Sequence, residues 1–152
     1  SRVVLMKGYD DFGIVFSSSI NSKKGKDFKE NSIASANFWY KETIQQIILV
    51  GNIVQLPNKF SDNIFAGRTR SAQAVAKISK QSEPMADEGK FRNDVLELVK
   101  SDSNIVRPLN WVAFRLEPYQ VEFWQGSKDR FHKRLMYKRQ KNELWQKQWL
   151  QP

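Results

Sequence analysis

The sequence predicts a mainly β (α+β) fold, a mostly antiparallel barrel with small helices at its edges. Two observations support this class. Short apolar runs alternate with turn residues along most of the chain, which is typical of antiparallel strands. The clearest helical periodicity is at residues 87–100, where an apolar stripe from Phe91 to Val99 lies between acidic residues at the start and Lys100 at the end. With 152 residues, the chain is expected to form one domain, 1–152.

The composition limits the chemistry of the chain. The absence of cysteine excludes disulfides, thiolate nucleophiles and cysteine zinc sites, and the single histidine excludes a multi-histidine metal site within one chain. No apolar run approaches the roughly 18 residues that a membrane span needs, so we expect no membrane-spanning segment. The absence of cysteine agrees with a cytoplasmic location, which we expect. The net charge of +9 predicts an anionic partner: nucleic acid, a membrane surface or a phosphorylated small molecule.

The expected elements follow from turn residues and from the spacing of apolar residues. Ser22 is the expected N-cap of a short helix that reaches Asn31. Gly51 marks a candidate bulge, and Pro118 is expected to turn the chain between two strands. The full expected order is a hairpin of strands 2–7 and 14–16 about a turn at 9–13, a helix at 23–31, strands 32–40 and 43–56, helices 58–67, 72–77 and 87–100, and two hairpins, 111–116 with 121–125 and 135–139 with 144–150.

The stretch from Val121 to Arg134 holds the only histidine in the sequence. If the chain stays extended there, Arg130, His132 and Arg134 point to one face, because successive side chains on a strand alternate. Two guanidinium groups and an imidazole beside Trp124 could hold a flat, electron-rich anionic ligand. The alternative is that Trp124 is a core residue and the arginines are a solvated strand face.

A second candidate site lies where the loop after residue 16 meets the expected helix at 23–31. A helix N-terminus with free N–H groups, the Ser22 hydroxyl and the adjacent Lys23 and Lys24 can bind a phosphate. A solvated basic helix is the alternative interpretation.

At these stretches the sequence resembles the pyridoxamine 5'-phosphate oxidase family. The resemblance rests on E-F-W-Q-G at 122–126, R-x-H-x-R at 130–134, R-x-V-L-x-K at 2–7, S-K-K at 22–24, S-K-Q-S at 79–82 and a closing hairpin that ends in L-x-P. It implies an FMN-binding split β-barrel that forms a homodimer with the flavin at the subunit interface. The family's N-terminal helix and first strand have no counterpart here, so we expect upstream residues to be missing.

The resemblance also implies roles for individual residues. His132 and Arg130 would be catalytic, and Lys7, Arg68, Arg130 and His132 would bind the substrate. Lys23 replaces the family's usual arginine, which keeps the charge and loses the bidentate geometry, and Ser17 replaces the usual aromatic residue. The expected FMN contacts are Arg2, Lys7, Ser17, Ser18, Lys23, Lys24, Gln46, Gln81, Ser82, Trp124 and Arg134.

The expected substrate is a small aromatic anion, with O2 as the electron acceptor. In the vitamin B6 enzymes of the family, a Lys, a Tyr, an Arg and a Ser hold the substrate phosphate; the matching residues here are Lys7, Ile64, Arg68 and Ala72. Losing two hydroxyl donors, each worth roughly 1.5–3 kcal/mol, weakens phosphate binding by about two to four powers of ten.

Three further segments, 45–49, 81–87 and 150–152, resemble the phenazine-biosynthesis branch, which implies oxidation of a reduced phenazine precursor with FMN and O2. The alternatives are a pyridoxine/pyridoxamine 5'-phosphate oxidase, a flavin carrier or haem-binding split barrel, and, outside enzymes, a basic nucleic-acid-binding barrel. The FMN-enzyme interpretation expects neither a nucleic-acid partner nor a membrane partner.

Overall fold

The computed structural model describes residues 1–152, which separate into two compact units. Unit 1 comprises Ser1–Asp10, Ile14–Asn31 and Gln55–Arg115, and unit 2 comprises Asp11–Gly13, Ser32–Val54 and Leu116–Pro152. The single domain over 1–152 therefore stays a prediction. No helix has both the length and the apolar character to cross a membrane.

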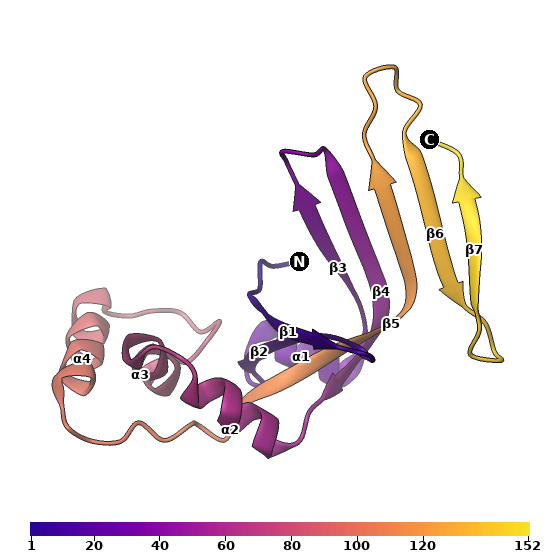
Figure 1. The fold of residues 1–152 in the computed structure, drawn as a ribbon. Helices are drawn as coiled ribbons and strands as arrows, with labels where there is room; N and C mark the ends of the chain where they lie inside the picture. Colours follow the sequence, from indigo (N-terminus) through magenta and orange to yellow (C-terminus); the bar gives the residue numbers. More distant parts are fainter. The chain divides into compact units, whose positions relative to one another are not determined.

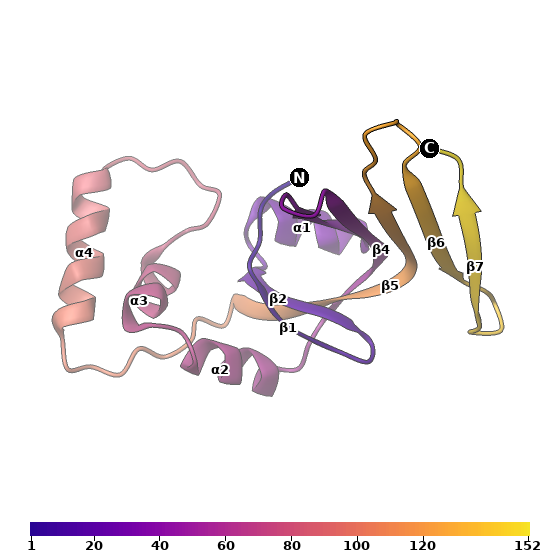
Figure 2. The same ribbon diagram turned by 45° about the horizontal axis from the view of Figure 1, so that its top comes forward.

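Unit 1 holds the four helices and the N-terminal strands (Figure 1). Its strands follow the order β1-β2-β5, and β5 contributes its residues up to Arg115 to this unit. Helices α3 and α4 contact each other and lie side by side in both views (Figures 1 and 2). The elements are β1 (Met6–Asp10), β2 (Gly13–Ser19), α1 (Lys23–Glu30), α2 (Asn58–Ala66), α3 (Arg70–Ile78), α4 (Glu88–Lys100) and β5 (Trp111–Gln125).

The core of unit 1 consists of two packed clusters. One surrounds Phe65 and Trp111, whose rings meet edge to face with centroids 5.3 Å apart, and the apolar stripe of α4 packs against it through Val95. The other contains Val15, Leu56 and Ala113. Ile64 of α2 packs against both clusters, and β5 contributes Trp111 to the first and Ala113 to the second.

The four predicted helices are present in the structure. They could be predicted because a helix start depends on nearby residues. Ser22 caps α1 by accepting a hydrogen bond from the Gly25 N–H, as its hydroxyl was expected to do. Asp87 caps α4 in the same way through the Lys90 N–H. The third helix starts at Arg70, two residues before its expected start, because Thr69 serves as its N-cap and accepts from the Ala72 N–H.

Unit 2 is an antiparallel sheet of β3 (Ile33–Tyr40), β4 (Gln45–Gln55), the second half of β5, β6 (Lys133–Arg139) and β7 (Trp145–Leu150). Figure 1 shows β5, β6 and β7 running side by side, and their registers place Trp124 opposite Arg134 and Arg134 opposite Leu150. The last predicted hairpin, β6 with β7, is confirmed.

The predicted turn at Pro118 is wrong, because β5 is one strand of 15 residues. Its ladder with β6 starts at Gln120, two residues beyond Pro118, so the missing proline N–H costs no bond of that ladder. The bulge predicted at Gly51 is also wrong for the pairing of β4 with β3, because that register runs through Ala34↔Gly51 without a break. The glycine is instead required for close packing, since a Cβ there would lie 2.1 Å from the Glu117 carbonyl oxygen.

The first strand begins at Met6, so the prediction of a strand from Arg2 is wrong. Val3 is 97% exposed and Leu5 is 71% exposed, so their apolar side chains gain no burial that would hold the backbone extended. The hairpin with β2 is present, and its turn is shorter than predicted, at Asp11 and Phe12.

Candidate functional site

The first group of predicted site residues gathers in unit 1 where β2 ends and α1 begins. We call Ser18, Ser22, Lys24, Gln81 and Ser82 the serine–lysine cluster. Ser18 and Ser22 are buried, and their hydroxyl oxygens lie 3.3 Å apart. The Ser18 hydroxyl donates to Gln81 Oε1 at 3.1 Å, which ties the segment after α3 to the end of β2.

Cations converge on this cluster. Lys24 Nζ lies 3.5 Å from the Ser22 hydroxyl oxygen, and burial, with the nearby charge of Arg2, lowers the pKa of Lys24 from its ordinary value. Both causes disfavour the charged amine, and a bound anion would offset both. The Lys23 N–H, at the start of α1, donates to the Ser82 hydroxyl at 3.2 Å.

The backbone of this cluster leaves no space for a larger residue at Gly25. A Cβ there would lie 2.5 Å from the carbonyl oxygens of Ser19 and Ile20. The chain therefore turns tightly from β2 into α1, which brings hydroxyls, helix N–H groups and an ammonium group together. Such a set of groups can bind a phosphate monoester, which would accept the hydroxyl protons that Ser18 now donates to Gln81 Oε1 and Ser22 to the Ser19 carbonyl.

Three other predicted residues of unit 1 lie on different elements. Lys7 is exposed on β1, and Ser17 is half-buried on β2. Arg68 lies between α2 and α3, where its Nη2 donates to the Ala72 carbonyl at 3.0 Å and its guanidinium stacks 5.1 Å from the Trp111 ring centroid. Burial lowers the pKa of Arg68, and its buried Nε has no hydrogen-bond partner. One guanidinium nitrogen of Arg68 is therefore bonded within its own unit, and Nε keeps an N–H without an acceptor.

The second group of predicted residues lies in unit 2 around Trp124. The His132 ring centroid is 4.8 Å from that of Trp124, and the Trp39 ring centroid is 6.2 Å from that of Trp124. Gln46 on β4 is the register partner of Trp39. The structure therefore brings together three aromatic rings with a neighbouring amide, of which sequence reasoning missed Trp39.

The condition for placing Arg130, His132 and Arg134 on one extended face is not met. Arg130 has φ +70° and belongs to the loop before β6, so strand alternation does not run through it. The loop is held instead by its own hydrogen bonds. Asp129 accepts from the Ser127 hydroxyl and, at 3.0 Å, from the Phe131 N–H, and these bonds lower the pKa of Asp129.

The same loop orients the imidazole of His132. The Ser127 N–H donates to His132 Nδ1 at 3.1 Å, so Nδ1 is an acceptor and the neutral ring carries its proton on Nε2. The edge available to a ligand is therefore an N–H donor.

Arg134 lies on β6 directly opposite Trp124. Its Nε donates to Glu122 Oε1 at 2.7 Å, and its Nη1 donates to the Gln151 carbonyl at 3.3 Å. The hydrogen bond that Arg134 donates to Glu122, with that carboxylate's charge, raises the pKa of Arg134. Glu122 belongs to the E-F-W-Q-G motif, yet the motif alone assigned it no role.

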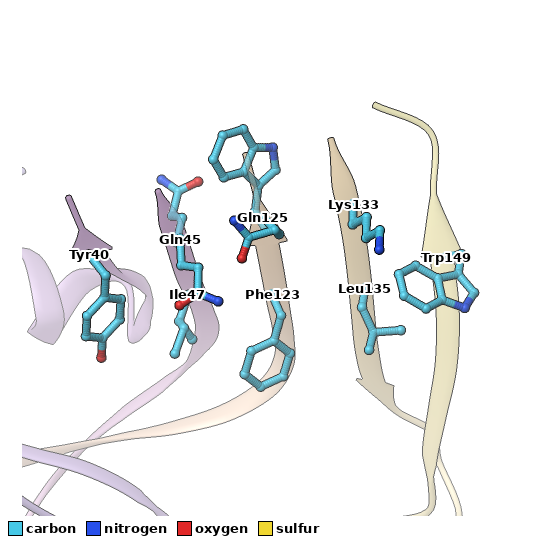
Figure 3. Close-up of a pocket in the computed structure, with 10 residues that line it drawn as sticks. Tyr40, Gln45, Ile47, Phe123, Gln125, Lys133, Leu135 and Trp149 are labelled. Atoms are coloured by element: carbon cyan, nitrogen blue, oxygen red, sulfur yellow. The ribbon is translucent and has the colours of Figure 1, made fainter. Parts of the chain in front are cut away.

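Unit 2 also contains a hollow of about 390 Å³ (Figure 3). Strand alternation places Phe123, Gln125 and Leu135 on one face of the β5–β6 ladder and Trp124 and Arg134 on the other. Most of the β5 and β6 lining therefore belongs to the face opposite Arg134. The hollow is lined by Tyr40, Gln45, Gln46, Ile47, Phe123, Trp124, Gln125, Lys133, Leu135 and Trp149.

Among these lining residues, sequence reasoning assigned a site role only to Gln46 and Trp124. The available signal was the alternation of apolar and polar residues on the last strands, which marks one face of a ladder. Which face is hollowed depends on neighbouring strands, so no single segment shows it.

Known proteins resemble this chain over most or all of its length. The protein-family model described as the pyridoxine 5'-phosphate oxidase C-terminal dimerisation region matches residues 111–152. A dihydrophenazinedicarboxylate synthase from Burkholderia lata is 36% identical over 152 residues, covering 100% of this chain and 71% of that protein. A pyridoxine/pyridoxamine 5'-phosphate oxidase from Ehrlichia ruminantium is 36% identical over 147 residues, covering 95% of this chain and 76% of that protein.

Solved structures agree. PhzG from Burkholderia lata, crystallised with tetrahydrophenazine-1-carboxylic acid, matches with a TM-score of 0.95 and 36% identity over 99% of this chain and 74% of that one. An FMN-binding protein from Nostoc punctiforme has the same fold, with a TM-score of 0.80 at 15% identity over 99% of this chain and 80% of that one. The chain therefore belongs to the pyridoxamine 5'-phosphate oxidase family of FMN-type oxidases, has that family's split β-barrel fold, and resembles its phenazine-biosynthesis branch along its whole length.

Proposed function

We propose that the chain is an FMN-dependent oxidase that acts on a reduced phenazine precursor, with O2 as the final electron acceptor. The observation that carries this choice of substrate is the side chains at three positions. Ile64 and Ala72 lack the hydroxyls that would hold a substrate phosphate, and the Arg68 guanidinium is bonded to the Ala72 carbonyl and stacked on Trp111. A full phosphate cradle is therefore absent from these positions.

The serine–lysine cluster is the proposed site of the FMN phosphate. Its hydroxyls, the N-terminus of α1 and Lys24 supply the donors and charge that a phosphate needs. We assign Arg2, Ser17, Ser18, Lys23, Lys24, Gln81 and Ser82 to this end of the cofactor, with Lys7 beside them.

The flavin ring is proposed to contact Trp124, Arg134 and Gln46. Trp124 offers a stacking surface and Arg134 a permanent positive charge. We further propose a homodimer with the flavin at the subunit interface. In support, residues 111–152 match a dimerisation region, and Phe123 and Trp149, both on the hollowed face, are 43% and 61% exposed in one chain.

Bound FMN would supply the redox chemistry, accepting a hydride from a substrate carbon next to nitrogen and passing the electrons to O2. The chain would orient the substrate and neutralise its charge. His132 presents the Nε2–H of its neutral ring, which suits hydrogen bonding to a substrate carboxylate. Arg130 and Arg134 would hold negative charge on substrate and cofactor, respectively.

The test is anaerobic mixing of the FMN-loaded protein with a dihydrophenazine carboxylate and, separately, with pyridoxine 5'-phosphate. We expect rapid bleaching of the flavin absorbance by the tricyclic substrate and slow or no bleaching by the phosphate ester. The opposite pattern would assign the chain to the vitamin B6 oxidases, an alternative favoured by Lys7 and Arg68, which keep both cations of the phosphate site. A protein that stays colourless after incubation with FMN would refute the flavoenzyme proposal itself.

A further inference from the structure

Glu122 is a buried carboxylate in the middle of the β5–β6 ladder. It is 7% exposed, and a charge withdrawn from water to this extent is costly unless it is paired and hydrogen-bonded. Its partner is Arg134, whose Nε donates to Glu122 Oε1 at 2.7 Å. The Arg134 side chain is more exposed than its partner's, at 33% against 9%.

The register places this pair next to Trp124. Trp124 lies directly opposite Arg134, and Glu122 precedes Trp124 by two residues, so the three side chains share one face of the ladder. Arg134 Nη1 is bonded to the Gln151 carbonyl at 3.3 Å. Two of the three guanidinium nitrogens are thus held within the unit, and Nη2 is left for a ligand beside the indole.

From this geometry we infer that Glu122 is a positioning residue that holds the guanidinium of Arg134 against the flavin ring and offsets part of its charge, thereby setting the reduction potential of the bound flavin. The inference rests on the proposed function, because it takes Arg134 as a flavin contact.

Two substitutions of Glu122 separate its effect on the reduction potential from its effect on the position of the guanidinium. A positive charge beside the flavin favours the reduced, negatively charged form, and a carboxylate behind that charge opposes it. Replacing Glu122 by glutamine keeps an acceptor oxygen for Nε and removes the negative charge. Replacing it by alanine removes the acceptor as well, so the guanidinium is no longer held.

The experiment compares FMN affinity and flavin midpoint potential in Glu122→Gln, Glu122→Ala and the parent. We expect Glu122→Gln to keep FMN affinity within about threefold and to favour the reduced form about tenfold more, which is about 30 mV more positive for a two-electron couple. We expect Glu122→Ala to lose about tenfold or more in FMN affinity.

The matched control is another Glu–Arg pair of unit 2. Glu143 pairs with Arg139 at 3.0 Å, and its side chain is 76% exposed. Glu143→Gln removes the same charge away from Trp124 and should change neither affinity nor potential. A double-mutant cycle completes the design: in an Arg134→Gln background, Glu122→Ala should cost no further FMN affinity, because the guanidinium that Glu122 positions is gone.

Two measurements keep the outcome decisive if Glu122 variants fold poorly. The first is the Arg134 Nε–H resonance of the flavin-free parent, which should exchange slowly with solvent because it is bonded to a buried carboxylate. The second is Arg134→Lys, which keeps the charge but has no Nε–H for Glu122, and which should lose FMN affinity as Glu122→Ala does.

The outcomes separate this inference from the proposal on which it rests. If the parent binds no FMN, the proposed function is refuted, and this inference with it. If the parent binds FMN but Glu122→Gln leaves the potential unchanged or lowers it, the flavoenzyme assignment survives and the role of Glu122 is structural only. Rapid solvent exchange at Arg134 Nε, or an Arg134→Lys variant with parental affinity, would overturn the positioning role.

Discussion

The double variant Ile64→Tyr/Ala72→Ser should convert the chain into a better binder of phosphorylated pyridoxine. These positions match the tyrosine and serine that hold the substrate phosphate in the vitamin B6 enzymes. The structure places Ile64 on α2 and Ala72 in the first turn of α3, on either side of Arg68. The variant restores two hydroxyl donors beside a cation that is already present.

The expected gain is large relative to its structural cost. Each hydrogen bond to a charged phosphate is worth about 1.5–3 kcal/mol, so the pair should tighten binding by about two to four powers of ten. Ile64 packs against both core clusters of unit 1, so the larger tyrosine should cost about 1–3 kcal/mol of folding free energy. The Arg68 hydrogen bond is kept, because its acceptor is the main-chain carbonyl of residue 72.

The assay is a binding titration of pyridoxine 5'-phosphate and of pyridoxine, which lacks the phosphate, to the FMN-loaded protein. The control variant is Ile64→Phe, which adds the ring without either hydroxyl. The gain should appear only for the phosphate ester and only in the double variant. If that variant binds the ester no more tightly than Ile64→Phe does, the substrate's anionic group is held elsewhere and the substrate argument loses its basis.

Two further predictions concern stability and pH. Arg70 donates to the carbonyls of Leu98 and Val99 in the last turn of α4 and of Ser101 and Ser103 beyond it. Arg70→Ala should therefore lower the free energy of unfolding by about 2 kcal/mol in a denaturant titration. Arg92→Ala, which removes only an exposed pair with Glu88, should cost less than about 0.5 kcal/mol, and equal losses would contradict the capping role. The pKa of Lys24 lies below 10.5 in the free protein, and a bound phosphate favours its charged form, so FMN affinity should fall as pH rises through that lowered value. Fluorescence titrations from neutral to alkaline pH should show this fall in the parent and not in Lys24→Arg; a pH-independent parent would remove Lys24 from the phosphate site.

Much of the fold could be predicted because its signals are local. A helix start depends on one side chain and the N–H groups two or three residues later, so Ser22 could be predicted as a cap from the sequence. The apolar stripe of α4 has the period of its own helix and needs no knowledge of a partner. The closing hairpin of β6 and β7 follows from the turn residues between two short runs.

The strand errors have a shared physical cause. Whether a proline breaks a strand depends on which neighbour needs its N–H, and at Pro118 the ladder with β6 has not yet begun. The same applies to Gly51, whose missing side chain makes room for the Glu117 carbonyl oxygen. Both facts concern segments far apart in the sequence.

For the candidate site, sequence alone determined which chemical groups the chain offers: cations and hydroxyls near residues 17–24, and Trp124, His132 and Arg134 near its end. Only the tertiary structure decided how these groups are used. In the folded chain the Arg68 guanidinium stacks on Trp111 and donates to the Ala72 carbonyl. The Ser127 N–H orients His132, and Arg134 pairs with Glu122. The reason is that a side chain's chemistry is carried by its own atoms, whereas its charge, tautomer and direction are set by the partners that folding brings within hydrogen-bond distance.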